Sequence, residues 1–342
     1  MRRTLATREK LLVGKHVLSQ VIGLGFAAEH SQLPNPIAHA ARSQYNSGML
    51  NSSRRDFLKA AAALPLLPSA FAAKRSATDW VTLGKSKVQV TRLAFGTGTH
   101  GGRIQRDLGQ KEFTRLVRHA YERGIRFFES ADNYDQMHEM LAEALRGIPR
   151  ENYRLMTKLR WQNAANPDYK PMADIERFRK ELNSDYFDIF LLHNVKTNTW
   201  PKDLEPLRDA LSEAKHKQLI RCHGCSGHGL LPIRAYPGNQ WLDVALMRVN
   251  HDGTRMDNIR DDAKIPGTRE EVLPTIEKVH AQGTGVLGMK IMGEGAFVTP
   301  EQRDASIKFV MQFGNVDAVT IGFKSTAEID EAITRIDTHL NT

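Results

Sequence analysis

The sequence predicts a single parallel α/β barrel, a (β/α)8 TIM barrel, and three observations lead to it. From Trp80 onward, short strand-like apolar runs alternate with segments of helical periodicity, which is the pattern of βαβ units. Eight such units fit into residues 80–339, a length that suits one barrel. Several of the apolar runs end in a titratable side chain, as expected where parallel strands converge on one face.

The first four units cover residues 91–216. Apolar and β-branched runs predict strands at 91–96, 125–130, 153–158 and 187–193. Apolar residues at helical spacing predict helices at 111–123, 135–146, 172–182 and 204–216. In the first of these helices Phe113, Leu116 and Val117 share one face, which we expect to pack against the barrel.

The last four units continue the same alternation. Strands are predicted at 219–225, 242–249, 285–290 and 316–321. Helices are predicted as a short segment from Leu230 and then at 269–282, 300–313 and 326–336. The chain therefore returns to the sheet eight times without an internal repeat other than the βα unit itself.

Three consecutive strand ends carry an acid, a phenol, an ammonium and an imidazole: Glu129, Tyr134, Lys158 and His193. A lysine or a histidine at a strand end is usually a solvated or hydrogen-bonded structural residue, so no single one of them indicates a function. Their joint placement at one face of a barrel favours a proton-transfer site.

In order and spacing these four residues resemble the catalytic tetrad of the aldo-keto reductases. The stretch Glu129-Ser130-Ala131-Asp132-Asn133-Tyr134 resembles the family's Asp-Thr-Ala-x-x-Tyr, with Glu in place of Asp. The resemblance implies that Tyr134 donates a proton, that Lys158 lowers its pKa from the ordinary value near ~10, and that Glu129 is the counter-ion of Lys158. His193 would orient the substrate oxygen. The longer carboxylate at position 129 departs from the family pattern.

The same resemblance implies NADP(H) as the cofactor. Gly224-Cys225-Ser226-Gly227 is similar to the Gly-x-Ser-Asn that holds the nicotinamide carboxamide, with Gly227 in place of Asn. After the sixth strand Asn250 is kept, whereas a Gln and a Tyr of the family pattern are absent. Met289 stands where an aromatic residue would stack on the nicotinamide. Gly96 and Thr97, after the first strand, are expected near the nicotinamide and the substrate.

The phosphate end of the cofactor site is closer to the family pattern. Ile321-Gly322-Phe323-Lys324-Ser325 resembles the segment after the eighth strand, a glycine turn that opens a helix whose N–H groups suit anions. Gly322, Lys324 and Ser325 are therefore predicted to bind the phosphates, with Lys324 opposite a 2′-phosphate. Lys290 begins the loop that the resemblance places over the diphosphate.

Charge and cysteine content narrow the possible partners. The net charge is +9, but residues 1–73 hold nine basic and three acidic residues, and the rest holds 39 and 36. With no basic stripe interleaved with aromatic residues, we predict no nucleic-acid partner. Cys222 and Cys225 fall three apart on a predicted strand, hence on opposite faces, and there is no second cysteine pair. We predict neither a disulfide nor a metal site.

Residues 49–72 resemble a twin-arginine export signal. Arg54 and Arg55 precede an apolar, Ala-rich stretch, and Ala70-Phe71-Ala72 fits an A-x-A cleavage site. The apolar stretch is too short for a membrane-spanning helix, which needs ~20 residues. We predict translation from Met49, residues 1–48 as an upstream extension outside the functional protein, and a periplasmic location reached through the twin-arginine export machinery. Because the twin-arginine pathway exports folded proteins, we expect the cofactor to be tightly bound before export.

The sequence thus predicts an exported aldo-keto reductase-like enzyme that reduces a small carbonyl substrate, or oxidises the matching alcohol, with NADP(H). The alternative is a non-catalytic exported barrel of the same ancestry that binds a ligand or a partner. Retention of Tyr134, Lys158 and His193 favours the enzyme, whereas the substitutions at the nicotinamide end favour the binding protein.

Overall fold

The computed structural model describes residues 74–262 and 264–342. The predicted extension at 1–48 and the predicted export signal at 49–72 lie outside the described residues, and so they stay predictions. Within the described part of the chain, no helix is long and apolar enough to cross a membrane.

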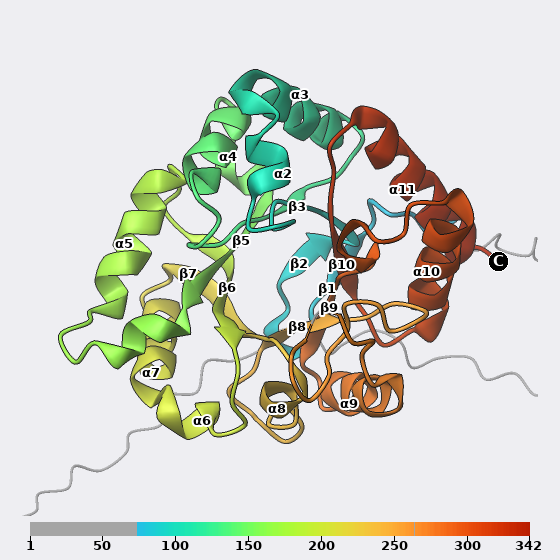
Figure 1. The fold of residues 1–342 in the computed structure, drawn as a ribbon. Helices are drawn as coiled ribbons and strands as arrows, with labels where there is room; N and C mark the ends of the chain where they lie inside the picture. Colours follow the sequence, from blue (N-terminus) through green and yellow to red (C-terminus); the bar gives the residue numbers. More distant parts are fainter. Residues whose placement is uncertain (1–73, 263) are drawn as a thin grey trace, which may run out of the picture. The chain divides into compact units, whose positions relative to one another are not determined.

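Eight parallel strands close into a barrel, which confirms the predicted fold class (Figure 1). In chain order they are β3 (Leu93–Gly96), β4 (Phe127–Glu129), β5 (Arg154–Arg160), β6 (Phe187–Val195), β7 (Ile220–Gly227), β8 (Val244–Arg248), β9 (Gly285–Met289) and β10 (Ala318–Gly322). Closure comes from β10, which pairs with both β9 and β3.

Helices surround the strands on the outside of the barrel (Figure 1). The α-helices are α2 (Arg103–Arg106), α3 (Gly109–Glu122), α4 (Met137–Leu145), α5 (Pro171–Glu181), α6 (Trp200–Asp203), α7 (Glu205–His216), α8 (Leu230–Ile233), α9 (Arg269–Ala281), α10 (Pro300–Phe313) and α11 (Thr326–Leu340). Short 3-10 turns are η2 (Gly84–Ser86), η3 (Arg150–Asn152), η4 (Trp161–Ala165) and η5 (Gly293–Gly295). The predicted face of α3 is buried as expected.

A hairpin at one end of the barrel was not predicted. β1 (Trp80–Thr82) pairs antiparallel with β2 (Gln89–Thr91), and the hairpin lies across the centre of the barrel in the view of Figure 1. Leu83 and Val90 of this hairpin are fully buried against the side chains inside the barrel. The predicted first strand, 91–96, is therefore two elements, because the chain turns at Arg92 between the hairpin and β3.

Alternate residues of each strand face the interior of the barrel, since side chains along a strand alternate between faces. The interior group contains Phe127, Met156, Ile189, Val244 and Leu287, whereas Phe128 and Leu155 belong to the layer beneath the helices. The two cysteines follow the same rule. Cys222 belongs to the interior group and Cys225 to the outer layer, which confirms that they face opposite sides of the strand, and both are free thiols.

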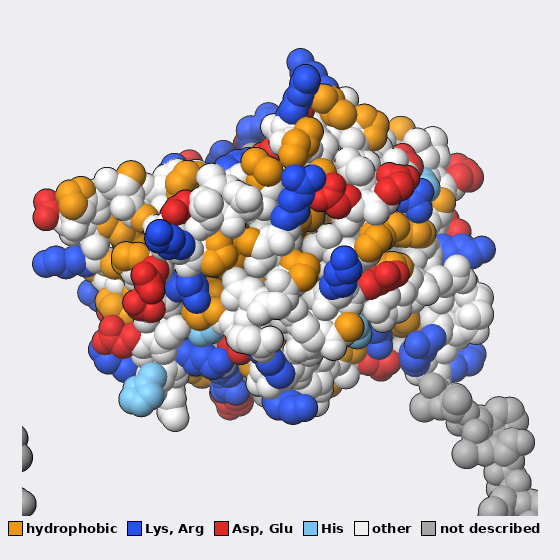
Figure 2. Space-filling view, turned by 90° about the horizontal axis from the view of Figure 1, so that it is seen from below, with side chains coloured by type: hydrophobic (Ala, Val, Ile, Leu, Met, Phe, Trp, Pro, Cys, Tyr) orange, Lys and Arg blue, Asp and Glu red, His pale blue; other side chains and the backbone are white. Residues whose placement is uncertain are grey.

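Charges of both signs are interspersed over the surface. Figure 2 shows Lys and Arg side chains interspersed with Asp and Glu on one face, with small groups of hydrophobic side chains between them. Ion pairs also link different elements, for example Arg177 of α5 with Asp132 at 2.8 Å and Arg335 of α11 with Asp304 of α10 at 2.7 Å.

Candidate active site

The carboxyl ends of the barrel strands surround a cavity of about 690 Å³. Most of the strands contribute to its lining one residue at or near the carboxyl end of the strand. These residues are Gly96, Glu129, Lys158, His193, Ser226, Met289 and Thr320. Loops after the strands, together with residues in the N-terminal halves of α10 and α11, also line the cavity.

The four residues of the predicted proton-transfer unit come together in this cavity. Lys158 is 1% exposed, and its Nζ is ion-paired with Glu129, donates to the backbone oxygen of Ser130 at 2.9 Å and lies 3.4 Å from Tyr134 Oη. The rings of Tyr134 and His193 meet edge to face, with centroids 5.6 Å apart. A buried ammonium thus joins a carboxylate to a phenol, and an imidazole lies beside the phenol.

The side chain of Glu129 is held by two neighbouring side chains. One oxygen of Glu129 faces Lys158, and Oε2 accepts a hydrogen bond from Thr320 Oγ1 at 3.2 Å. Gly96 on the neighbouring strand leaves the space that the extra methylene requires. A methyl group at Gly96 would lie 2.9 Å from Glu129 Oε2 and 2.5 Å from Thr320 Oγ1. The barrel interior therefore accommodates Glu at this position.

The structure corrects the expectation that Lys158 lowers the pKa of the Tyr134 phenol. Burial, followed by the Glu129 carboxylate, raises the pKa of Tyr134 well above its ordinary value. The expectation that Lys158 would lower the pKa is wrong for this state, because burial and the carboxylates of Glu129 and Glu294 disfavour the phenolate. Tyr134 consequently keeps its proton at neutral pH, and the phenol is available as an acid.

The two basic groups are shifted in the opposite sense. Burial lowers the pKa of Lys158, although Glu129 partly restores it. Burial and the nearby charge of Lys158 lower the pKa of His193 well below its ordinary range, so the imidazole is neutral at pH 7. A neutral imidazole has one donor and one acceptor nitrogen.

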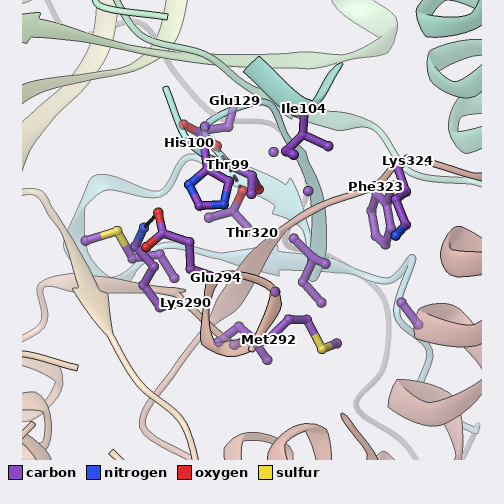
Figure 3. Close-up of a pocket in the computed structure, with 18 of the residues that line it drawn as sticks. Thr99, His100, Ile104, Glu129, Lys290, Met292, Glu294, Thr320, Phe323 and Lys324 are labelled. Atoms are coloured by element: carbon purple, nitrogen blue, oxygen red, sulfur yellow. Dashed lines mark hydrogen bonds and ion pairs between the residues drawn. The ribbon is translucent and has the colours of Figure 1, made fainter. Parts of the chain in front are cut away.

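Six of the predicted cofactor residues line the same cavity: Gly96, Ser226, Met289, Lys290, Gly322 and Lys324. Figure 3 shows Lys290 and Glu294 together on one side, and Phe323 and Lys324 on the opposite side. Lys290 Nζ is 2.5 Å from the Glu294 carboxylate, so this cation already has a partner. Lys324 is largely exposed, and its backbone N–H donates to Glu328 at 2.8 Å.

The other four predicted cofactor residues, Thr97, Gly227, Asn250 and Ser325, do not line the cavity. Thr97 donates to the backbone oxygen of Glu129 at 2.9 Å, and the N–H of Gly227 donates to Tyr236 Oη at 2.6 Å. The Asn250 amide donates to the backbone oxygens of Thr254 and Lys290, and its oxygen accepts from Gly253 N–H.

Ser325 caps α11 by accepting a hydrogen bond from the N–H of Glu328. These four predicted residues therefore stabilise the loops around the cavity. A sequence pattern alone does not distinguish a residue that stabilises a loop from one that contacts a ligand.

The lining residues that were not predicted include Thr320, Glu294 and His228. Thr320 could have been found from the alternation of β10, since it lies two residues before Gly322 and shares its face. Glu294 and His228 stand in loops, where periodicity says nothing about direction. For His228, its position two residues after Ser226 was the available signal.

Comparison with known proteins agrees with this arrangement. Residues 92–339 match the Aldo/keto reductase family. The protein defined by this barrel and this strand-end tetrad belongs to the aldo/keto reductase family, which confirms the resemblance seen in the sequence.

Individual relatives are distant. A probable aldo-keto reductase 1 of Glycine max is 28% identical over 144 residues, which is 40% of each chain. The chain thus spans less than half the length of this curated relative.

Among solved structures, an aldo-keto reductase of Bacillus halodurans in its holo form has 19% identity and a TM-score of 0.58, covering 77% of this chain and 95% of that one. An aldo-keto reductase of Klebsiella pneumoniae, solved with NADPH, has 15% identity and a TM-score of 0.57, covering 75% and 89%. At these identities the structural likeness concerns the fold.

Proposed function

We propose that this protein is an NADP(H)-dependent oxidoreductase that reduces a small carbonyl compound to its alcohol, or oxidises the matching alcohol, with Tyr134 as the proton donor. The observation that carries the proposal is the buried unit in which Lys158 Nζ contacts both Glu129 and Tyr134 Oη. Family membership and the NADPH bound to the Klebsiella pneumoniae relative support it.

The cavity has features that fit a nicotinamide dinucleotide. Its volume of about 690 Å³ lies within the usual range for ligand pockets. The Ser226 hydroxyl is buried and lacks a hydrogen-bond partner among the described residues, so a carboxamide could satisfy it. A methyl group at Gly322 would lie 2.6 Å from Thr99 Oγ1, so only glycine leaves the backbone open there.

In this assignment Ser226 would hold the carboxamide, Met289 would pack on the nicotinamide ring, and Gly322, Lys290 and Lys324 would face the phosphates. When bound, the dinucleotide supplies or accepts the hydride.

Side chains of the protein bind the carbonyl oxygen of the substrate and donate a proton to it. His193 donates a hydrogen bond to the carbonyl oxygen and aligns the carbonyl group with the phenol. As hydride reaches the carbonyl carbon, the C=O double bond becomes a single bond, and the proton of Tyr134 moves to the oxygen. The Lys158 ammonium stabilises the Tyr134 phenolate that is left. A proton from solvent then restores the phenol. Oxidation of the alcohol follows the same path in reverse.

The first test is a titration of the protein with NADPH and NADH by fluorescence and calorimetry, followed by assays with a panel of small aldehydes and ketones. We expect NADPH binding and NADPH-dependent loss of the carbonyl compound. Binding of neither dinucleotide, together with no turnover, would contradict the proposed function.

We also propose export by the twin-arginine pathway, with the cofactor loaded in the cytoplasm. The support comes from the arginine pair and the A-x-A site in the sequence. In cell fractionation, the protein should appear in the periplasm, and replacing Arg54 and Arg55 by Lys should retain it in the cytoplasm. Equal periplasmic amounts of both forms would refute the pathway.

A further inference from the structure

The segment that carries Tyr134 is fastened to β5, the strand that carries Lys158. This segment, residues 130–138, leads from the end of β4 into the first turn of α4. The N–H of Asp132 donates to the backbone oxygen of Lys158 at 3.1 Å, and the backbone oxygen of Tyr134 accepts from the N–H of Met137 at 2.8 Å. A movement of α4 relative to β5 would therefore move the phenol relative to the ammonium.

His138, in the first turn of α4, contacts both β5 and α5. Its side chain is 4% exposed, and Nδ1 donates to Glu181 Oε2 at the end of α5, at 2.8 Å. Nε2 lies 2.8 Å from Thr157 Oγ1, and the ring packs edge to face on Phe178 with centroids 4.9 Å apart. Thr157 immediately precedes Lys158 on β5, so this imidazole holds α4 next to the residue that carries the ammonium.

A second connection runs from α5 back to the same segment. Glu181 Oε1 accepts from Arg177 at 2.7 Å, and the same guanidinium donates to Asp132 at 2.8 Å. Burial would raise the pKa of Glu181, but the hydrogen bonds from His138 and Arg177 lower it below its ordinary value. The carboxylate thus stays charged at neutral pH. Because Asp132 and His138 lie on either side of Tyr134 in the chain, α5 holds both sides of the phenol.

The row of Thr157, His138 and Glu181 has the order of a nucleophilic triad, yet none of the three lines the cavity. Thr157 is fully buried, and by the alternation along β5 it faces the helices, whereas Lys158 faces the interior of the barrel. The hydroxyl therefore cannot reach a ligand in the cavity. Any effect of this row on the chemistry passes through the positions of Tyr134 and Lys158.

Resting on the proposed function, we propose that His138 is a positioning residue for the proton transfer. Its contacts with Thr157 and Glu181 keep α4 in one place against β5, and this placement brings Tyr134 Oη to Lys158 Nζ. The phenol and the ammonium are 3.4 Å apart, near the outer limit for a hydrogen bond. A small shift of α4 therefore separates them, and a displacement of ~1 Å caused by a remote substitution can cost ~10²-fold in rate.

The test breaks one contact from both of its sides. His138→Phe keeps an aromatic ring against Phe178 and removes both hydrogen bonds, and Thr157→Val replaces the hydroxyl by a methyl group. His138→Gln is the conservative variant, because its amide can donate to Glu181 and accept from Thr157. kcat and KM are measured with NADPH and the carbonyl compound that wild type reduces fastest, and calorimetry gives the Kd for NADPH.

The matched control is His223→Phe. His223 is also a buried histidine, 6% exposed, and its ring stacks on Trp241 with centroids 4.4 Å apart. It lies toward the amino end of β7, whereas the proton-transfer unit lies at the carboxyl ends of the strands. A loss of activity that follows only from disturbing a buried histidine should therefore appear in this control as well.

We expect His138→Phe and Thr157→Val each to lower kcat by about tenfold or more, while KM and the Kd for NADPH change by less than about twofold. The double variant should fall no further than the worse single variant, since both changes break the same contact. His138→Gln should stay within about threefold of wild type, and the control should match wild type. Losses that add in the double variant, or losses as large in His138→Gln or in the control, would overturn the proposal.

The distance between Tyr134 Oη and Lys158 Nζ gives a readout that needs no turnover. In crystal structures it should be at least ~0.5 Å longer in His138→Phe than in wild type. The same lengthening is expected in Thr157→Val, so the test survives if the Phe variant does not fold. If wild type turns over no carbonyl compound, the proposed function fails and this distance decides the inference alone. An unchanged distance would overturn it.

Discussion

Tyr134 is the residue whose removal tests the chemistry most directly. Tyr134→Phe deletes the proton donor and keeps the ring that packs against His193. Turnover should fall by ~10²-fold or more, as expected for loss of a general acid, while NADPH affinity changes little. The measurement is kcat by NADPH absorbance together with a calorimetric Kd. Unchanged turnover would remove Tyr134 from the mechanism.

Substitutions at Glu129 test whether the charge or the length of its side chain matters more for activity. Glu129→Asp should keep substantial activity, because a carboxylate near Lys158 is retained. Glu129→Gln should lose much of it, because the contacts with Glu129 raise the pKa of Lys158 against the effect of burial. Without that charge the ammonium more readily loses its proton and no longer stabilises the phenolate.

The readout for Glu129 is the pH–rate profile of the three proteins. The wild-type profile should stay flat far into the alkaline range, because the pKa of Tyr134 is raised and its acid form persists. In the Gln variant, a limb of the profile should be displaced, since the coupled groups titrate differently. Superimposable profiles would place Glu129 outside the proton-transfer unit.

At the scale of elements, we predict that Lys324, just before α11, binds the 2′-phosphate of NADPH. Lys324→Ala should weaken NADPH binding and leave NADH nearly unchanged. The loss should fall at the low end of ~1–3 kcal/mol, because the Lys324 side chain is 69% exposed and Glu328 lies 3.9 Å from its Nζ. Lys308→Ala on α10 is the control, and calorimetric titration is the measurement. Equal weakening of both dinucleotides would exclude this role.

The hairpin β1–β2 should contribute to stability and leave the chemistry alone. Leu83→Ala removes a fully buried side chain from the end of the barrel opposite the cavity, at an expected cost of ~2–5 kcal/mol. Val88→Ala, at a half-buried position of the same hairpin, should cost less than ~1 kcal/mol. Urea denaturation gives both values. A Leu83→Ala protein as stable as wild type would show that packing of the hairpin does not stabilise the barrel.

For the whole molecule, buried neutral histidines should make the fold sensitive to acid. Burial lowers the pKa of His223 to about 4. Because the unfolded chain then binds the proton more readily, the free energy of unfolding falls as the pH decreases from about 6.5 through the folded pKa. His223 alone should remove about 3 kcal/mol at ~1.4 kcal/mol per pKa unit. His193 and His228 act in the same direction.

The check on this acid sensitivity is the melting temperature between pH 8 and pH 4. Asp257, whose pKa burial raises to about 6, acts in the opposite direction, so the comparison with a variant isolates the histidine. His223→Gln should give a shallower decline than wild type. Parallel curves would show that His223 does not carry the effect.

The barrel could be predicted from the sequence because its signals are periodic. Strands such as 187–193 are continuous apolar runs, and helices such as 111–123 carry one apolar face, so element type follows from local pattern. The hairpin β1–β2 was missed because its strands have three residues each, too few for a period to show. Strand ends also located Glu129, Tyr134, Lys158 and His193, since parallel strands deliver their ends to one face.

What the sequence could not provide was the direction of side chains in loops and the balance of charges. Asn250 matched a family position, yet its amide is used in hydrogen bonds to the backbone of Gly253, Thr254 and Lys290. His228 matched none, yet its ring faces the cavity. The pKa of Tyr134 is raised by burial and then by the nearby Glu129 carboxylate, and both depend on the three-dimensional arrangement.

The missing side chain at Gly96 links three positions on three neighbouring strands. Any Cβ at position 96 would meet both the carboxylate of Glu129 and, more closely, the hydroxyl of Thr320, so a shorter acid at 129 alone would not make room for it. A side chain at 96 would therefore need compensating changes at 129 and at 320 together. The three positions are constrained as a set, and single substitutions at Gly96 should be poorly tolerated.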